Sequence, residues 1–391
     1  MGKKPLEGIR TVEVTVYVTG PVTTQLMADC GAEAIQIETG SRRTGAAGFR
    51  RAEGQRRAST GKLSVSLNFQ TPKGLDLARR IISTADIFVE NLAGGTLTRR
   101  GLGYEDVRKI KPDIIYLASC MQGQTGPHAT HAASGHKLSA LTGYNHIAGW
   151  PDREPAWVGT YTDFVAPRYN ILAILGALDY RRRTGKGQFL DISQYEAGVQ
   201  FMGPALLDYT VNKRVAERMG NKNPYAAPHN AYRCRGEDRW CAIAVFATDE
   251  WRSFCNVIGN PALAEDPMFA TLLARKENEE LLDLIINDWT STRQAEEVAV
   301  LMQGAGVAAG VVENIEDQVS YDPQLRHRRF FWEMEAPEDG KEQPSQDPYY
   351  RLSLRVRQGP TLGESNDYVF KKLLGMSENE IAGLVKEGVI A

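Results

Sequence analysis

Asp163 is the residue whose type and position could perform covalent chemistry in this chain. It stands just ahead of a long apolar run that predicts a helix. An aspartate at such a place is ordinarily the N-cap, whose side-chain oxygen accepts a backbone N–H. The same carboxylate can be a covalent nucleophile when a closed site holds an activated carbonyl against it. The residue by itself leaves both interpretations open.

Other reactive constellations are weaker. His128, His131, His136 and His146 fall in one loop-like stretch, but they lack the HExxH spacing of a helical metal site. No GxGxxG follows the first predicted strand, and the chain has no GxxxxGK[ST]. We therefore expect no metal site, no dinucleotide fingerprint and no P-loop.

Composition narrows the functional classes. The 391 residues carry a formal charge of −2 and no long basic block, so nucleic acid and anionic membranes are not expected partners. No apolar run reaches membrane-spanning length, and the five cysteines are odd in number and form no CxxC pair. These features predict a cytoplasmic protein with reduced thiols.

The first part of the chain alternates predicted strands with predicted helices. Strands are expected at 9–16, 34–38, 63–69, 86–91 and 113–119, and helices at 21–30, 71–85 and 104–110. This alternation predicts an α/β fold with a Rossmann-like parallel sheet covered on both faces. Ligands of such sheets bind at the carboxyl ends of the strands, so the loops after Val16, Asn91 and Ser119 are candidates for the site.

The chain is long enough for two domains. We predict a large catalytic domain at 1–211, a linker at 212–228, and a small α+β domain at 229–330. The small domain should contain strands at 239–246 and 306–314, and helices from Thr248 and at 277–289 and 292–303. We expect a polar return linker at 331–358. A last segment at 359–391 should rejoin the large domain.

Five motifs in a fixed order resemble the family III CoA-transferases, which include formyl-CoA transferase, carnitine CoA-transferase and α-methylacyl-CoA racemase. The motifs are GPVTTQLMADCGAEAIQIE (20–38), DIFVENLAGGTLTRRGLGYEDV (86–107), the block from TDF to FLDIS (162–193), GVAAGVVENIEDQVSYDPQLRHR (306–328) and GPTLGES (359–365). Together they span nearly the whole chain.

The resemblance implies a role for Asp163 as the catalytic nucleophile. In the family the aspartate attacks a donor thioester to give an aspartyl anhydride, then an aspartyl-CoA thioester, from which CoA passes to an acceptor acid. Coenzyme A is thus expected as a substrate, with no tightly bound cofactor. The positive end of the helix should keep the carboxylate ionised at neutral pH. The cap and the nucleophile are therefore compatible roles.

The resemblance also implies which residues contact CoA. They are Val18, Thr19, Leu67, Gln70, Asn91, Leu92, Ala93 and Arg99. Arg99 can hold a phosphate through its bidentate guanidinium. The chain departs from the family at Thr39 and Gln70, where a basic residue is frequent, so Lys73, Arg42 or Arg43 could supply the missing charge.

Two alternative functions remain open. In the racemase relative a histidine pairs with the aspartate to move an α-proton, and His136 stands near that position. The residue after it is Lys137, where the racemase carries an acid. The other alternative is a CoA-binding subunit without catalytic activity, in which Asp163 would be only a helix cap.

The acceptor and the assembly are expected from the same resemblance. Aromatic residues precede Asp163 at Tyr144, Trp150, Trp157 and Tyr161, which suits either an apolar or aryl-bearing acid or a place in the core. The chain resembles the branch acting in anaerobic aromatic degradation, where succinyl-CoA donates to an arylsuccinate such as benzylsuccinate. The family fold implies an interlocked homodimer, or a heterodimer or heterotetramer with a paralogous subunit, connected through 212–228 and 331–358.

Overall fold

The computed structural model describes residues 4–39, 59–131, 134–328, 330–333, 344–346 and 359–390. Arg42 and Arg43 lie outside them. The chain divides into two compact units. The large unit comprises Met1–His146, Trp157–Ala216 and Trp332–Ala391, and the small unit comprises Ile147–Ala156 and Glu217–Phe331. Residues 147–156, which the sequence placed in the large domain, thus group with the small unit.

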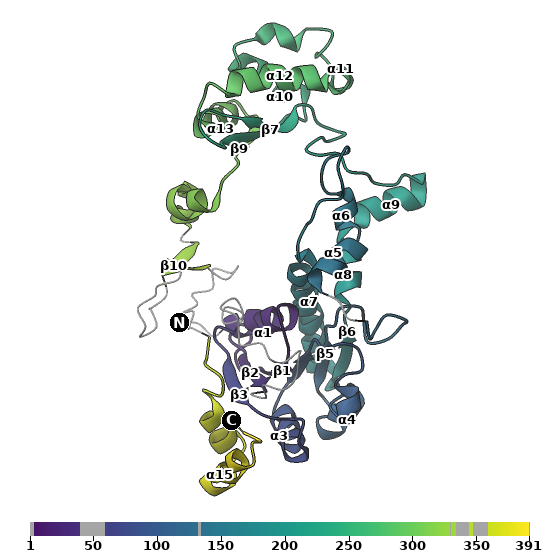
Figure 1. Cartoon of the computed structure of the whole chain (residues 1–391), viewed down its shortest axis with the longest axis vertical. Coiled ribbons are helices and arrows are strands. Elements are labelled where there is room, and N and C mark those ends of the chain that lie inside the picture. The colour runs from purple at the N-terminus through teal and green to yellow at the C-terminus, as the bar shows by residue number, and fades with distance from the viewer. Residues whose placement is uncertain are drawn as a thin grey trace. The chain divides into compact units, whose positions relative to one another are not determined.

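A six-stranded parallel sheet forms the centre of the large unit (Figure 1). Its strands are β1 (Arg10–Val14), β2 (Glu33–Glu38), β3 (Leu63–Ser66), β4 (Ile87–Glu90), β5 (Ile115–Ala118) and β6 (Gln188–Asp191). The order is β3-β2-β1-β4-β5-β6, and every neighbouring pair is parallel. The predicted Rossmann-like α/β class is confirmed, and β6 is a strand that the sequence analysis did not identify.

The strand order reverses between β1 and β4. Strand β1 pairs with β2 on one side, at Val12↔Ile35, and with β4 on the other, at Val12↔Phe88. The loops that follow β1 and β4 therefore diverge to opposite sides and leave a crevice at the carboxyl edge. Asn91 joins the two loops, because its side chain accepts from Val16 N–H at 2.8 Å and donates to Val16 C=O at 2.7 Å. This pair of hydrogen bonds ties the loop after β1 to the start of the loop after β4.

Helices cover both faces of the sheet. On one face α1 (Thr19–Asp29) and α7 (Tyr161–Thr184) lie side by side and pack on Val89 and Leu117. On the other, α3 (Pro72–Ser83) and α4 (Tyr104–Ile110) pack on Val12 and Ile35. The alternation of strand side chains between the two cores is the period-two pattern of a pleated strand.

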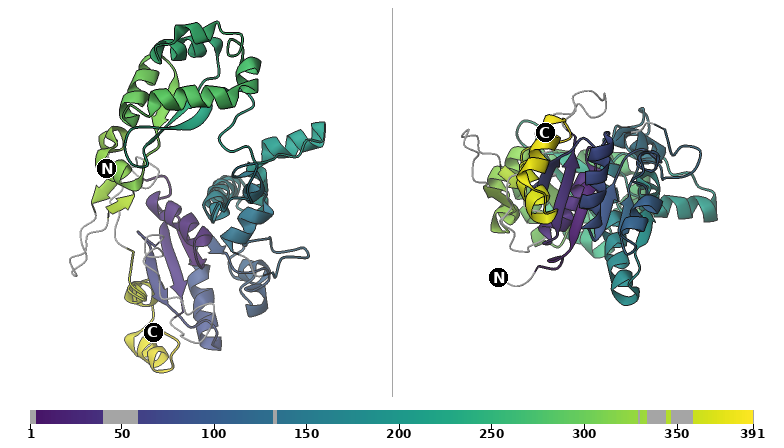
Figure 2. Two further views of the ribbon diagram at one scale, coloured as in Figure 1. Left: turned by 45° about the horizontal axis from the view of Figure 1, so that its top comes forward. Right: turned by 90° about the horizontal axis from the view of Figure 1, so that it is seen from below.

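The C-terminal segment returns to the large unit beside β3 (Figure 2, yellow). It contains a π-helix at Asp367–Leu373 and α15 (Glu378–Lys386). Leu67 forms a bridge with Ile390, and Asn68 N–H donates to Val389 C=O at 2.8 Å. Residues far apart in the sequence therefore complete the edge of the sheet.

The nucleophile candidate lies in the first turn of α7. This helix buries Val165, Ala166 and Ile174, and it leaves other apolar side chains such as Phe164 and Leu172 exposed. It ends at Gly185, whose φ of +73° is the left-handed conformation that glycine favours. Pro167 lies inside the helix and has no N–H, so the carbonyl of Asp163 cannot receive the usual helical hydrogen bond from it.

The remaining helices of this part are short. They are the 3₁₀ turn Thr98–Arg100, α5 (Gly135–Leu141), α6 (Tyr144–Ile147), α8 (Gln194–Phe201) and α9 (Gly203–Asn212). Among all described residues, no helix has both the length and the apolar character needed to cross a membrane.

The small unit is built on an antiparallel sheet with its own core. Its strands are β7 (His229–Arg233), β8 (Trp240–Ala244) and β9 (Ala308–Val311), and its helices are Pro261–Ala264, α10 (Thr248–Val257), α11 (Leu272–Glu277), α12 (Glu279–Thr290), α13 (Ala295–Gly304), Asp317–Tyr321 and α14 (Pro323–His327). Two further short strands, β10 (Phe331–Glu333) and β11 (Pro344–Gln346), pair with each other. The predicted α+β composition is present, whereas β7 was not predicted.

A buried ion pair holds the start of α1 to the sheet. Lys62 Nζ lies 2.7 Å from Glu13 Oε1 and 2.7 Å from Pro21 C=O, and both charged side chains are fully buried. The hydroxyls of Thr15 and Thr24 donate to the other oxygen of Glu13 at 2.6 and 2.7 Å. Because every partner would be left desolvated, removal of one charge should be costly.

We expect Lys62→Met to destabilise the protein by about 3–5 kcal/mol, because it leaves the Glu13 carboxylate buried without its cation. Lys73→Met is the matched control, since the Lys73–Glu387 pair is exposed and should contribute less than about 1 kcal/mol. Urea unfolding followed by circular dichroism measures both. Equal midpoints for the two variants would contradict this assignment, and adding Glu13→Gln to Lys62→Met should recover part of the loss.

Candidate active site

Asp163 is the third residue of α7, whose N-cap is Thr160. The interpretation of Asp163 as the cap is therefore wrong, because the helix begins three residues earlier than a cap at Asp163 would place it. The side chain is instead turned inward and is only 9% exposed. It lies beside Thr19, the first residue of α1, and His136 of α5. The carboxylate thus sits next to the crevice of the sheet.

Gly135 packs directly against the carboxylate. A Cβ at this position would lie 2.6 Å from Asp163 Oδ2 and 2.7 Å from the Cβ of Thr160, which are distances that real Cβ atoms do not adopt. Only glycine therefore lets the start of α5 approach the first turn of α7. The sequence analysis did not single out Gly135; its sole sign there was a glycine directly before His136.

Burial raises the pKa of Asp163 to about 6, while the nearby His136 and Thr19 favour the ionised form and limit the rise. The sequence led us to expect that the helix end would dominate and keep the carboxylate ionised. Desolvation is the larger effect. With a pKa near 6 the carboxylate is nevertheless ionised in roughly nine molecules of ten at pH 7, and it is a stronger base than an exposed aspartate.

His136 shares this environment. Its ring stacks on Trp157 with the centroids 4.7 Å apart, and Trp157 is itself 70% exposed. Its Nδ1 is buried and finds no hydrogen-bond partner within the described residues. Lys137, the next residue, is exposed. The structure thus brings His136 to Asp163 and leaves Lys137 on the surface.

Asn170 fixes α7 relative to the crevice. Its amide donates to Thr23 of α1 and to Ser119 after β5, each at 2.9 Å, and the hydroxyl of Thr23 donates to Thr19 C=O at 2.7 Å. These bonds connect the helix that carries Asp163 to the helix that begins beside it. A lone amide in the apolar run of α7 was the sign that the sequence analysis overlooked.

The residues expected to contact CoA occupy the two loops of the crevice. Val18 and Thr19 begin α1, directly after Tyr17, whose φ of +61° is a strained conformation for a non-glycine residue. Strain of this kind concentrates at functional sites. Leu92 is partly exposed and Ala93 is exposed. The side chain of Asn91 is occupied by Val16, so any contact it makes with a ligand must add to this pair of hydrogen bonds.

The other residues expected to contact CoA, or to supply the missing charge, differ in their exposure. Arg99 is exposed, and its guanidinium turns back to Gly94 C=O at 3.5 Å and Thr96 at 3.4 Å. Leu67 is fully buried in the core, which leaves its backbone as the part that could meet a ligand, while Gln70 is exposed. Lys73 is bound to Glu387 at 2.7 Å.

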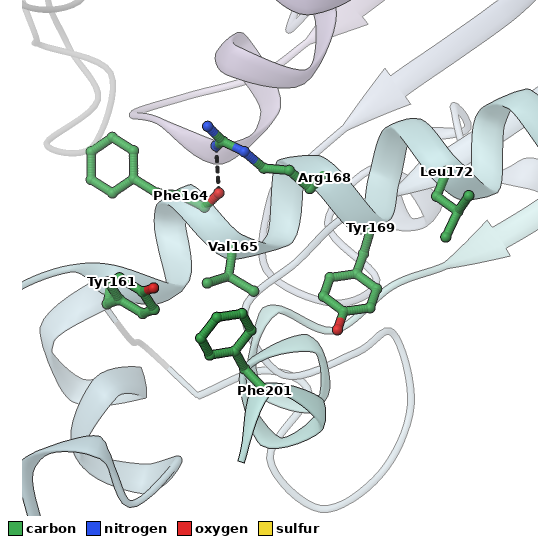
Figure 3. A pocket seen from close by; sticks show the side chains of 7 residues that line it. All are labelled: Tyr161, Phe164, Val165, Arg168, Tyr169, Leu172 and Phe201. Carbon is green, nitrogen blue, oxygen red and sulfur yellow. Dashed lines mark hydrogen bonds between the residues drawn. The ribbon is translucent and has the colours of Figure 1, made fainter. Parts of the chain in front are cut away.

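A groove of about 540 Å³ runs along the outer side of α7, next to the turn that carries Asp163 (Figure 3). Its lining is Tyr161, Phe164, Val165, Arg168, Tyr169, Leu172 and Phe201. Arg168 turns toward the carbonyl of Phe164, to which it donates a short hydrogen bond. Tyr144, another expected substrate aromatic, is instead a core residue whose hydroxyl donates to Gly198 C=O at 2.7 Å.

The described part of the chain contains no group of three or more His, Cys, Asp or Glu side chains placed to hold a metal ion. The crevice offers a desolvated carboxylate, an imidazole beside it and the start of a helix.

Comparison with known proteins gives consistent matches over nearly the whole chain. The model of CoA-transferase family III matches residues 6–366. The succinyl-CoA–D-citramalate CoA-transferase of Chloroflexus aurantiacus is 33% identical over 99% of this chain and 98% of its own length. The succinyl-CoA:glutarate CoA-transferase of Mus musculus is 31% identical over 99% and 90%. The crystal structure of a CAIB/BAIF family protein from Brucella suis aligns with a TM-score of 0.83 at 28% identity, covering 95% of this chain and all of that one.

We expect the carboxylate of Asp163 to titrate with a midpoint near 6 in ¹³C NMR of protein labelled at aspartate, with the resonance assigned by its loss in Asp163→Asn. Thr19→Val and His136→Gln should each raise that midpoint, because both residues favour the anion. Asp179, which lies exposed on the same helix beside Arg182, has a lowered pKa and is the internal reference. A midpoint near 4 for Asp163 would show that burial does not control its charge.

Proposed function

Because the chain belongs to the family III CoA-transferases, we propose that it moves CoA from succinyl-CoA to a dicarboxylic acid through covalent intermediates on Asp163. The observation that carries the proposal is the buried carboxylate beside the start of α1 at the crevice of the sheet. Both of the named relatives use succinyl-CoA and act on a dicarboxylic acid by name, which supports the donor and the acceptor class.

The proposed chemistry is balanced without an external acid or base. An oxygen of the Asp163 carboxylate attacks the thioester carbonyl of the donor, the C–S bond breaks, and a mixed anhydride and CoA thiolate form. The thiolate attacks the aspartyl carbonyl, which releases the donor acid and leaves an aspartyl-CoA thioester. The acceptor carboxylate attacks this thioester, and the thiolate then takes the acyl group from the second anhydride and restores Asp163. One negative charge is present throughout.

The environment of Asp163 suits these steps. Removal from water increases the nucleophilicity of a carboxylate, and a pKa near 6 still leaves it ionised at neutral pH. Gly135 and Thr160 hold it in place from one side. The start of α1, at Thr19, contributes a partial positive charge where negative charge develops during the reaction. Burial also protects the anhydride from hydrolysis.

CoA is proposed to lie along the crevice between the loops after β1 and β4. Val18 and Thr19 would line one side, Asn91, Leu92 and Ala93 the other, and Arg99 would turn outward to a phosphate. Leu67 and Gln70 follow β3 at the same edge of the sheet and would contact the distal end of the molecule. CoA in this proposal is a substrate that leaves with each turnover.

The acceptor is proposed to be a dicarboxylic acid in general, of which an arylsuccinate such as benzylsuccinate is one candidate. The exposed indole of Trp157, stacked on His136 beside Asp163, supports an acceptor with an apolar or aromatic substituent. A screen of citramalate, glutarate, malate and benzylsuccinate against succinyl-CoA would distinguish these candidates.

The racemase alternative rests on one observation, the position of His136 beside Asp163. Two bases exchange an α-proton efficiently when they face opposite sides of the carbon. The named relatives are CoA-transferases, which favours transfer as the reaction of this chain. Exchange of the α-proton of an acyl-CoA in deuterated water, without any covalent enzyme intermediate, would support the racemase instead.

The assembly is proposed to be an interlocked dimer in which a second copy covers α7 and α9. Exposed apolar side chains gather on these helices and at the end of α8, namely Phe164, Leu172, Leu175, Phe201, Leu206, Leu207, Tyr209 and Val211. A surface of this kind is unusual for a monomer. A paralogous subunit in place of the second copy is the alternative, and a catalytically silent subunit would then be recognised by its lack of an acyl-enzyme.

We expect incubation with succinyl-CoA followed by hydroxylamine to modify Asp163 and no other carboxylate. Asp163→Asn should lower CoA transfer by at least about 1000-fold, because the nucleophile is lost. Asp179→Asn is the matched control, since Asp179 lies on the same helix but is exposed and paired with Arg182 and Arg183. Peptide mass mapping and a transfer assay measure the two effects. Unmodified Asp163 in a transferring enzyme would contradict the mechanism.

We expect Leu172→Glu to prevent dimer formation, because it places a charge in the groove on the outer side of α7. Leu273→Glu on α11 is the control, since Leu273 is equally exposed at 69% but is not part of this surface. Size-exclusion chromatography with light scattering reports the mass of each variant. A wild-type protein that is monomeric alone but dimeric with a paralogue would favour the heteromeric assembly.

A further inference from the structure

Glu90 is a buried acid that the proposed chemistry does not use. It is the last residue of β4 and is only 3% exposed. Its Oε2 accepts from Leu92 N–H at 2.8 Å, and its Oε1 accepts from the side-chain amide of Gln124 at 3.0 Å. Both of these groups donate a hydrogen bond to the carboxylate.

Gln124 continues the chain of bonds. Its Oε1 accepts from Gly95 N–H at 2.9 Å, while its own backbone N–H donates to Asp191 at 3.1 Å. The segment 92–95 is thus held at both of its ends, at Leu92 directly by Glu90 and at Gly95 through Gln124. This segment begins with the residues proposed to contact CoA.

We propose that Glu90 is a positioning residue for CoA, which holds segment 92–95 in its binding conformation through three hydrogen bonds that all run toward one ionised carboxylate. The inference rests on the proposed function, because it assumes that segment 92–95 binds CoA. The amide of Gln124 must present its oxygen to Gly95 and its nitrogen to Glu90. All three bonds can therefore form only when residue 90 offers two acceptors.

Protonation of Glu90 would break this pattern. Burial is the main cause that raises its pKa to about 7, with a smaller contribution from Asp191, while the N–H groups of Leu92 and Gln124 limit the rise. The other titratable groups that face it are Tyr116 of β5 and Cys120 after β5. Above pH 7 the ionised form accepts both bonds. Below pH 7 one oxygen carries a proton and faces a donor, so one bond is lost.

The test exchanges the acid and the amide. In Glu90→Gln one amide nitrogen must face another donor, and in Gln124→Glu two carboxylates face each other. Each single variant should raise the KM for succinyl-CoA by about tenfold with kcat within about twofold, as expected for the loss of one buried hydrogen bond. The double variant Glu90→Gln/Gln124→Glu restores all three bonds, with donor and acceptor exchanged only in the bond between residues 90 and 124, so its KM should return toward that of the wild type.

A matched control and a second measurement keep the test decisive. Glu33→Gln changes an acid of β2 that pairs with Arg10 at the surface, and its KM should be unchanged. In the wild type, KM for succinyl-CoA should rise as the pH falls through 7. In the double variant the carboxylate is at position 124, so the pH at which KM rises should change to the pKa of that group. The dependence of KM on pH can be measured even if neither single variant folds.

The outcomes separate the inference from the proposed function. A Glu90→Gln enzyme with wild-type KM, a double variant no better than the folded single variants, or a wild-type KM that is constant between pH 6 and 8 would overturn the role of Glu90. A wild-type protein that neither binds CoA in calorimetry nor forms an acyl-enzyme would overturn the proposed function instead.

Discussion

The reversal of strand order between β1 and β4 is the constraint on which the chemistry of the large unit depends. Because the chain leaves β1 toward one side and β4 toward the other, the two following loops cannot cover each other, and a crevice remains at the carboxyl edge. Asn91 ties the two loops together at that edge by binding both backbone groups of Val16. Helix α1 then begins where the crevice opens, and Asp163 is brought to this helix start.

The position of Asp163 balances two opposing requirements. A carboxylate that reacts with a thioester must lose water, yet it must keep its charge to react at all. Burial raises its pKa, and the imidazole of His136 and the hydroxyl of Thr19 limit the rise, so that the group stays mainly ionised at neutral pH. Glu90, farther down the same edge, is buried more completely and has a pKa near 7. The two acids thus differ through their surroundings and not through their type.

The sequence predicted the parts of this arrangement that local patterns encode. β1 to β5 and the helices between them follow from apolar runs punctuated by proline and glycine, as at Pro21 and Gly31. β6 was not predicted because it is only four residues long and lies at the edge of the sheet, where its residues alternate between partly buried and exposed and form no apolar run. The helix of Asp163 was predicted, but its start was not, since Tyr161 and Thr162 gave no sign of helix. Contacts between distant segments, such as Gly135 with Asp163 or Glu90 with Gln124, have no local pattern from which they could be predicted.

Pro167 affects how the first turn of α7 can accommodate the different groups that Asp163 would carry during the reaction. A helix ordinarily ties each peptide carbonyl to the N–H four residues later, and at Asp163 that N–H is replaced by the proline ring. The carbonyl of Asp163 therefore lacks the helical bond that the rest of α7 has, while the N–H of Asp163 still donates to Thr160 C=O at 2.9 Å. Asp163 would carry, in turn, a free carboxylate, an anhydride and a bulky thioester. Under the proposed chemistry the first turn can yield to each new substituent while Asn170, one turn beyond the proline, keeps the remainder of the helix in register with the sheet.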